Sequence, residues 1–264
     1  MVVRRADAIQ FLATRGWLSV TSPSFREAVF ARLVVRAYRK GDLIYRADDP
    51  PGGLWAVVRG GIEVEHSTQP MNFGRPGMWF GEAPLVIGVR RQVSVAAVQS
   101  TTMATLPLPD CRAILGADPS GWRWIALLSC ALQVVTLDAF KDQLLRDPKK
   151  RAAALLLRLS GTRRAGFWPL DPSPVQLSQD KLAQILNLSR TSVVSILQGF
   201  AELGYIELKY RSILVADASG LREVVETEEP EVAFPLQGPV IRPKVRGAKL
   251  RRPNYRAIMR GRPN

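Results

Sequence analysis

The stretch LSQDKLAQILNLSRTSVVSILQGFAELGYIEL, from Leu177 to Leu208, decides the fold of this chain. It predicts a short helix, a tight turn, a second helix and then a strand. That order is typical of a helix-turn-helix, in which the second helix enters the major groove of DNA. We therefore expect a DNA-binding module here, and the remaining sequence must explain how it is positioned and controlled.

The first helix of this module is expected to run from Ser178 to Leu186. Ser178 is a suitable N-cap because its hydroxyl can accept a hydrogen bond from an N–H group of the first turn. Leu182, Ile185 and Leu186 are expected to form the buried face. Asn187 tolerates the left-handed backbone conformation that a tight turn requires, so the helix should end there.

The second helix is predicted to begin after its cap, Ser189, and to end at Gly204. Its apolar positions predict an inward stripe of Val193, Ile196, Leu197, Phe200 and Leu203. The outward residues of its first turns should face base edges. Arg190 is the predicted base reader, because a guanidinium can bond both O6 and N7 of guanine. We assign to the DNA-binding surface Ser189, Arg190, Thr191, Ser192 and Ser195. The hydroxyls of Thr191, Ser192 and Ser195 can bond phosphates.

A β-hairpin is predicted directly after the second helix. The segments Tyr205–Leu208 and Ile213–Val215 are apolar enough to be strands, and a tight turn joins them. Lys209 and Arg211 lie at the tip of this predicted wing and can reach the phosphate backbone. The alternative interpretation is a helical hairpin with no role in DNA binding.

The sequence before this module predicts helices and then strands. Residues 1–33 have helical spacing at Phe25, Val29 and Leu33, with Ser22 or Ser24 as the cap. From Val34 to about Leu108, short apolar runs alternate with glycine- and proline-containing turns, which indicates an antiparallel sandwich or barrel. The fold class is therefore α+β.

A long helix is predicted from about Pro119 to Leu145. Its apolar residues at alternating spacings of three and four are Ile125, Leu128, Leu132, Val135 and Ala139. We expect this seam to pair with another helix, as in a coiled coil; the alternative is that the helix lies on its own β domain. Pro148 should open a further helix to Ser160, residues 161–174 should form a loop, and residues 219–226 can add a short helix.

These patterns divide the chain into four parts. We expect an antiparallel β domain with its N-terminal helices at residues 1–118, a pairing helix at 119–147, a winged helix-turn-helix at 148–226 and a disordered basic tail at 227–264. The tail contains six prolines and its apolar residues show no period, which is typical of disorder.

The bulk composition favours a soluble protein with a polyanionic partner. The 264-residue chain has a net charge of +14, but nine of these charges follow Glu231, so residues 1–231 carry five. The two cysteines, Cys111 and Cys130, have no metal-ligand spacing, and we expect no metal site. The apolar run Trp124–Leu137 is shorter than the roughly 20 residues that a membrane span needs. We therefore expect a cytoplasmic protein with no membrane association.

Three short motifs resemble the CRP/FNR family of bacterial transcription regulators. Tyr38–Tyr45 is similar to the family's opening strands, Leu54–Val64 to its strand, glycine turn and strand, and Leu188–Val193 to the start of its recognition helix. The resemblance covers roughly residues 30–225. It implies a β-roll of the cyclic-nucleotide-binding type, a dimerisation helix and a winged helix-turn-helix. It also implies a homodimer on double-stranded DNA, with RNA polymerase as a candidate partner.

The same resemblance bears on the recognition helix. Arg190 falls on a base-reading arginine of the family. Thr191 and Ser195 fall where better-known members carry a glutamate and a second arginine, so the DNA sequence that is read can differ from theirs.

The resemblance also suggests a ligand site. Phe80–Glu82 and Arg90–Val95 are similar to the family's phosphate-binding cassette, which implies that Gly81, Glu82 and Arg91 hold a cyclic nucleotide, cAMP or cGMP. Buried phosphate requires charge and N–H donors. Thr136 falls where a family threonine meets the base.

Two residues depart from the cassette pattern. Gln92 belongs to the expected ligand-binding set with Gly81, Glu82, Arg91 and Thr136, but it stands where Ser or Thr is usual. Pro84 removes one N–H donor. The sequence therefore leaves a cyclic nucleotide, another small ligand and no ligand all open.

These residues are compatible with four functions to different degrees. The best supported is a sequence-specific DNA-binding regulator controlled by a signal at the β-roll, and its closest alternative is a ligand-independent regulator with a vestigial pocket. A third is a sequence-neutral nucleic-acid-binding module led by the basic tail. An enzyme is disfavoured because the sequence has no P-loop, HExxH or GxSxG motif, so we predict no catalytic residues.

Overall fold

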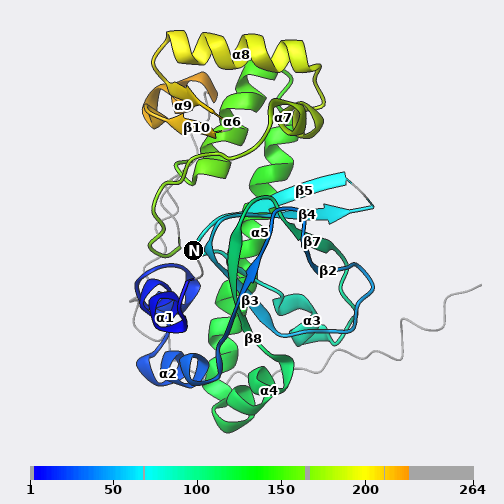
Figure 1. The fold of residues 1–264 in the computed structure, drawn as a ribbon, viewed down its shortest axis with the longest axis vertical. Helices are drawn as coiled ribbons and strands as arrows, with labels where there is room; N and C mark the ends of the chain where they lie inside the picture. Colours follow the sequence, from blue (N-terminus) through cyan, green and yellow to red (C-terminus); the bar gives the residue numbers. More distant parts are fainter. Residues whose placement is uncertain (1–2, 68, 164–166, 211, 226–264) are drawn as a thin grey trace, which may run out of the picture. The chain divides into compact units, whose positions relative to one another are not determined.

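The computed structural model describes residues 3–67, 69–163, 167–210 and 212–225. Figure 1 shows its elements in chain order. They are α1 (Arg5–Thr14), η1 (Trp17–Val20), α2 (Pro23–Arg32), β1 (Val34–Tyr38), β2 (Leu43–Tyr45), β3 (Leu54–Arg59), β4 (Ile62–His66), β5 (Gln69–Gly74), β6 (Trp79–Phe80), α3 (Glu82–Ile87), β7 (Ser94–Ala97), β8 (Thr101–Leu106), α4 (Leu108–Ala117), η2 (Pro119–Gly121), α5 (Trp122–Leu144), α6 (Pro148–Ser160), α7 (Gln179–Leu186), α8 (Arg190–Glu202), β9 (Ile206–Lys209), β10 (Ser212–Val215) and α9 (Ala218–Val225). The predicted basic tail lies outside the described residues.

Two four-stranded antiparallel sheets form a β-roll between α2 and α4 (Figure 1). Their strand orders are β1-β8-β3-β6 and β2-β7-β4-β5. A compact apolar cluster of Val57, Ile62, Phe80, Val95 and Met103 draws its residues from both sheets. The prediction of an antiparallel β structure within an α+β fold is therefore confirmed.

The N-terminal helices share a second apolar core with β3, β8, α4 and α5. Ser22 caps α2 by accepting a hydrogen bond from the N–H of Phe25 at 3.4 Å. The rings of Trp17 and Trp79 meet edge to face at a centroid distance of 5.3 Å. Phe25 and Val29 are buried on the helical period that the sequence predicts. Residues 3–33 therefore belong to the same packed unit as the β-roll.

The predicted pairing seam of the long helix is wrong. Ile125 and Leu128 are 2% and 0% exposed because they pack into the core beneath the N-terminal helices, and Leu132 packs partly against it. Val135 and Ala139 are half-buried. The seam therefore rests on the chain's own β-roll, and spacing alone could not tell this from pairing with a second helix.

A second stripe on α5 remains exposed. It consists of Ala126, Cys130, Gln133, Leu137, Phe140 and Leu144, which again alternate at three and four residues. Leu137, Phe140 and Leu144 are 51%, 61% and 64% exposed. Three large apolar side chains exposed in one line are unusual for a soluble monomer and mark an interaction surface.

The two stripes together make this helix unusually apolar. By length and composition Pro119–Leu144 could cross a membrane, a property that core helices of soluble proteins share. The apolar run that the sequence analysis identified ends at Leu137, whereas the helix continues to Leu144.

The helices α6 to α9 and the β9–β10 hairpin form a third packed cluster, which we call the C-terminal module. Its core centres on Leu155, Leu156, Leu182, Leu197 and Phe200. Asp147 caps α6, with Pro148 at the first helical position. The predicted helices at 149–160 and 219–226 are thus present with small shifts of their ends.

A buried carboxylate joins α5 to the C-terminal module. Asp142 accepts a hydrogen bond from Nε of Arg158 at 2.9 Å, and Arg163 donates to its other oxygen. The three side chains are 3%, 8% and 10% exposed, respectively. Both guanidinium groups have left water for this contact, so its loss is costly.

We predict that Asp142→Asn lowers the free energy of unfolding by about 3–5 kcal/mol, because two mostly buried guanidinium groups would then face a neutral amide. Urea denaturation followed by circular dichroism measures this change. The matched control is Asp7→Asn, which removes an ion pair with Arg4 whose side chains are 45% and 82% exposed and should change the free energy of unfolding far less, because solvent screens an exposed pair. Equal losses in the two variants would contradict the prediction.

Candidate functional site

The helix α7 is formed as the sequence predicts. Ser178 is its N-cap and accepts a hydrogen bond from the N–H of Lys181 at 3.2 Å. Leu182 and Leu186 are 1% and 3% exposed within the module core. Asn187 ends the helix in the left-handed conformation, at φ 52° and ψ 49°. The turn therefore has the geometry that presents α8 across α7 (Figure 1).

The helix α8 begins and ends with recognisable caps. Ser189 accepts from the N–H of Ser192 at 3.1 Å. At the other end, Tyr205 N–H bonds Phe200 O at 2.9 Å and Gly204 N–H bonds Ala201 O at 3.0 Å. This pair of bonds is a Schellman motif, and it needs the positive φ of 74° that glycine adopts without strain.

The inward stripe of α8 is confirmed at four of its five positions. Val193, Ile196, Leu197 and Phe200 are all at most 9% exposed. Leu203 is 63% exposed, against the prediction, because it lies at the helix C-cap, beyond the last turn that packs on the module core.

The opposite face of α8 presents the predicted DNA-contacting residues to solvent. Arg190, Thr191, Ser192 and Ser195 are exposed. The hydroxyl of Ser189 bonds those of Thr191 and Ser192, each at 2.8 Å. The Arg190 Nε lies 3.5 Å from Asp180 Oδ1, and both side chains are about two-thirds exposed, at 65% and 66%. This weak surface contact leaves the guanidinium able to turn toward a ligand.

The wing is a two-stranded hairpin. Ser212 pairs with Lys209 and Val215 with Ile206. The Lys209 Nζ lies 2.9 Å from Glu207 Oε2, an exposed contact that phosphate could replace. Tyr210, at the tip, is 88% exposed and was not singled out in the sequence, where nothing but its place in the turn marked it. Arg211 lies outside the described residues.

The suggested cassette forms a sharp turn into a short helix. Gly81 has φ 97° and precedes α3, a helix that the sequence did not predict. Burial raises the pKa of the Glu82 carboxyl, and the backbone N–H groups of the turn partly offset this effect. Pro84 is the third residue of α3, so the N–H it lacks would have been one of the free donors at the helix start.

Arg91 points inward from the end of the cassette. It is 5% exposed, its Nη2 donates to Gly53 O at 3.2 Å, and its guanidinium carbon lies 4.3 Å from the centre of the Tyr45 ring. Its Nη1 is buried and has no hydrogen-bond partner among the described residues. Burial lowers the pKa of this guanidinium. A buried donor without a partner is costly unless something else binds it.

Gly81, Glu82 and Arg91 therefore lie together, but the other two predicted ligand residues do not join them. Gln92 is exposed, so its side chain does not replace the buried hydroxyl that is usual there. Thr136 is exposed on α5 and donates its hydroxyl to Leu132 O at 2.9 Å. It lies beside the exposed apolar stripe.

Polar contacts join the β-roll and α5 to the first helix of the helix-turn-helix. Lys181 Nζ lies 2.5 Å from Glu63 Oε1 on β4. Gln143 on α5 donates to Ile185 O on α7 at 3.3 Å. A displacement of β4 or α5 would therefore act directly on α7, the helix that supports α8.

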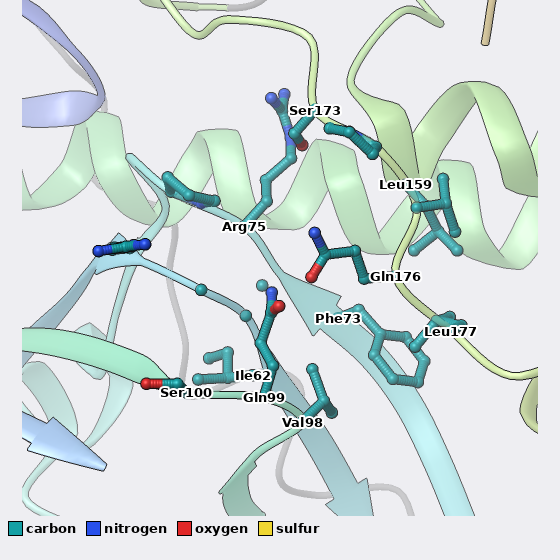
Figure 2. Close-up of a pocket in the computed structure, with 17 residues that line it drawn as sticks. Ile62, Phe73, Arg75, Val98, Gln99, Ser100, Leu159, Ser173, Gln176 and Leu177 are labelled. Atoms are coloured by element: carbon teal, nitrogen blue, oxygen red, sulfur yellow. The ribbon is translucent and has the colours of Figure 1, made fainter. Parts of the chain in front are cut away.

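A cavity of about 390 Å³ also lies at this junction. Figure 2 shows Gln99 and Gln176 facing each other across it, with Phe73 and Leu177 on one side. Its lining comes from β-strand turns, α6 and residues 173–177. The sequence gave no sign of this cavity, because its lining residues come from five separate segments that only the fold brings together.

Comparison with known proteins agrees with this architecture. The family model "Cyclic nucleotide-binding domain" matches residues 35–118, and "Crp-like helix-turn-helix domain" matches residues 150–224. The two models together match more than half of the chain, so the chain belongs to the CRP/FNR family of transcription regulators. It is a DNA-binding regulator of that type.

Individual relatives span most of the chain. It is 27% identical over 229 residues to the HTH-type transcriptional regulator Cmr of Mycobacterium tuberculosis, covering 83% of this chain and 88% of that one. It is 28% identical to the cyclic AMP receptor protein of Thermus thermophilus, covering 72% and 87%. These relatives are transcription regulators, not enzymes.

Solved structures show the same fold. FixK2 from Bradyrhizobium japonicum matches 75% of this chain and 99% of its own with a TM-score of 0.61 at 18% identity. A CRP/FNR-family regulator from Thermus thermophilus matches 74% and 100% with a TM-score of 0.55 at 24% identity.

Proposed function

We propose that this regulator is a homodimer that binds a cyclic nucleotide, cAMP or cGMP, at the β-roll, and that this binding changes its affinity for DNA. The observation that carries the ligand assignment is Arg91: a 5%-exposed guanidinium whose Nη1 has no hydrogen-bond partner among the described residues. A cyclic phosphate supplies the negative charge and the acceptor that such a group lacks.

The surroundings of Arg91 suit the rest of the ligand. Gly81 turns the backbone next to the guanidinium, and a Cβ there would come within 3.0 Å of Arg91 Nη1. Glu82 begins α3 beside it and can accept from a ribose hydroxyl. Pro84 and the exposed Gln92 weaken the case, because each removes a donor that the phosphate would use. A regulator with a vestigial pocket is thus the competing function.

We predict that the protein binds cAMP or cGMP and that Arg91→Ala weakens binding by about 10- to 100-fold, because one charge-assisted hydrogen bond is worth about 1.5–3 kcal/mol. Isothermal titration calorimetry measures both affinities. Arg90→Ala is the matched control, since Arg90 is 60% exposed and pairs with Asp48, and it should bind as the wild type does. No heat with either nucleotide would favour the vestigial pocket.

The proposed dimer uses the exposed stripe of α5. In a parallel pair with two-fold symmetry, each position of the stripe meets its own copy. Leu137, Phe140 and Leu144 would then be buried, which explains why so apolar a helix carries solvent-facing leucines. Thr136 lies at the edge of this interface, where a residue can contact both a ligand and the second chain.

Cys130 provides a test of this dimer, because the stripe places it opposite Cys130 of the second copy. We predict that mild oxidation links two chains covalently, as judged by non-reducing gel electrophoresis, and that Cys130→Ser abolishes the link. Cys111 should not react, because it is fully buried and burial raises its thiol pKa to about 11. A linked species that persists in Cys130→Ser would contradict the proposed interface.

We further propose that the DNA contacts are made by α8 and the wing. Arg190 would read a base, while Ser189, Thr191, Ser192, Ser195, Lys209 and Arg211 would bind the backbone. Two copies of α8 in the dimer would meet half-sites about 34 Å apart. With one arginine among small hydroxyl residues, selectivity would depend strongly on half-site spacing and DNA shape.

We predict that Arg190→Ala reduces the ratio of specific to non-specific DNA affinity, by about 1–3 kcal/mol at the base it reads. Lys209→Ala should instead weaken binding to all sequences and reduce the slope of log affinity against log salt by about one. Fluorescence anisotropy with specific and scrambled duplexes over a salt series separates the two effects. Unchanged selectivity in Arg190→Ala would exclude it as the base reader.

The remaining proposals follow from the family and the composition. We propose a cytoplasmic location, RNA polymerase as a candidate partner, and no catalytic residues, metal or membrane association. The basic residues 227–264 would add non-specific affinity for DNA phosphates.

A further inference from the structure

The junction cavity has unused hydrogen-bonding capacity. The side chains of Gln99, Ser100, Ser173 and Gln176 line it, and none of them hydrogen-bonds to another described residue. Figure 2 shows the amides of Gln99 and Gln176 facing each other across the space. Polar groups that line a cavity without protein partners are available to a ligand or to water.

The charge of the lining is one-sided. Arg59 and Arg75 both line the cavity, and no aspartate or glutamate does. Arg75 donates to the backbone oxygen of Asp171 at 2.9 Å, while the carboxylate of Asp171 pairs with Arg15 at 2.8 Å. The Asp171 carboxylate lies beyond ion-pair distance of Arg75, so its charge only partly offsets the burial that lowers the pKa of this guanidinium. The cavity is therefore suited to an anion.

Part of the lining is apolar. Ile62, Phe73, Leu159 and Leu177 contribute to it, and Figure 2 places Phe73 and Leu177 on the side away from Arg75. A volume of about 390 Å³ falls at the lower end of the range for small-molecule sites. An occupant would thus combine an oxyanion with an apolar body.

The cavity also adjoins the DNA-binding elements. Val175 in its lining exchanges two backbone hydrogen bonds with Ile213 of β10, at 2.8 and 2.9 Å. Leu177 in the lining directly precedes Ser178, the cap of α7. An occupant would therefore hold the β-roll, the wing and α7 in one arrangement.

We propose that this cavity binds a small organic anion, a carboxylate or a phosphate ester with an apolar body, and that its binding changes DNA affinity. The site is separate from the cassette and does not depend on cyclic nucleotide binding there. Arg59 and Arg75 hold the oxyanion, and Gln99 and Gln176 bond the polar edge of the body. Anion binding is coupled to DNA binding if the DNA-bound and DNA-free arrangements of the β-roll and the C-terminal module enclose the cavity to different extents.

The test uses the full-length protein and two probes, benzoate and 5′-AMP, with benzyl alcohol and adenosine as their uncharged counterparts. We expect at least one anionic probe to bind in calorimetry, equally in the wild type and in Arg91→Ala, and to shift the DNA-binding midpoint. Comparing the affinities for benzoate and 5′-AMP shows whether the cavity prefers a carboxylate or a phosphate ester. Binding that is lost in Arg91→Ala belongs to the cassette and overturns the proposal.

Two variants locate the site. Arg59→Gln and Gln176→Leu should each weaken binding of the anionic probe by about ten-fold, since each removes a direct donor. The matched controls Arg112→Gln and Gln10→Leu change exposed residues elsewhere and should bind as the wild type does. Absence of binding by both anions, equal binding of the uncharged counterparts, wild-type affinity in both site variants, or an unmoved DNA midpoint would each overturn the proposal.

Discussion

The packing of the inner face of α5 on the β-roll is the interaction on which the rest of the structure depends. Ile125 and Leu128 close the core beneath the N-terminal helices, and burying each such side chain is worth about 1.5–3 kcal/mol. Because that face is committed, the helix can present its other apolar stripe outward. The same rigid element then carries Asp142 and Gln143 toward the C-terminal module.

Buried charges serve different ends in the two halves of the chain. Asp142 with Arg158 and Arg163 is compensated internally, which ties α5 to the module and favours one arrangement of the two. Arg91 has no hydrogen-bonded carboxylate partner among the described residues, and the Asp171 carboxylate near Arg75 pairs with Arg15 instead. A partly desolvated cation of this kind lowers stability unless an anion binds it, which is why both arginines belong to the proposed ligand sites.

The routes from the β-roll to the recognition helix are short. Lys181 contacts Glu63, Gln143 contacts α7, and Val175 pairs with the wing. Each joins the β-roll, α5 or the segment before α7 to an element that positions α8. A modest shift in the β-roll can therefore change the position of α8 and the wing through direct contacts.

The sequence by itself determined the local structure of the DNA-binding module. Helix caps and turn conformations depend on residues only a few positions away, so their roles can be predicted without the fold. The examples here are Ser178, Asn187, Ser189 and Gly204. The outward position of Arg190 follows from helical period in the same way. The glycine-punctuated strands likewise indicated an antiparallel sheet.

Only the tertiary structure decided which face of α5 is free, which arginines are compensated, and where a cavity opens. The seam through Ile125 and the stripe through Leu137 have the same spacing, and contact with the β-roll alone distinguishes them. Leu203 fits the helical period but lies past the packed core. Gln99 and Gln176 are 77 positions apart in the chain and meet only because the β-roll and the C-terminal module pack together. Helical period records local geometry, whereas burial and charge compensation depend on distant residues.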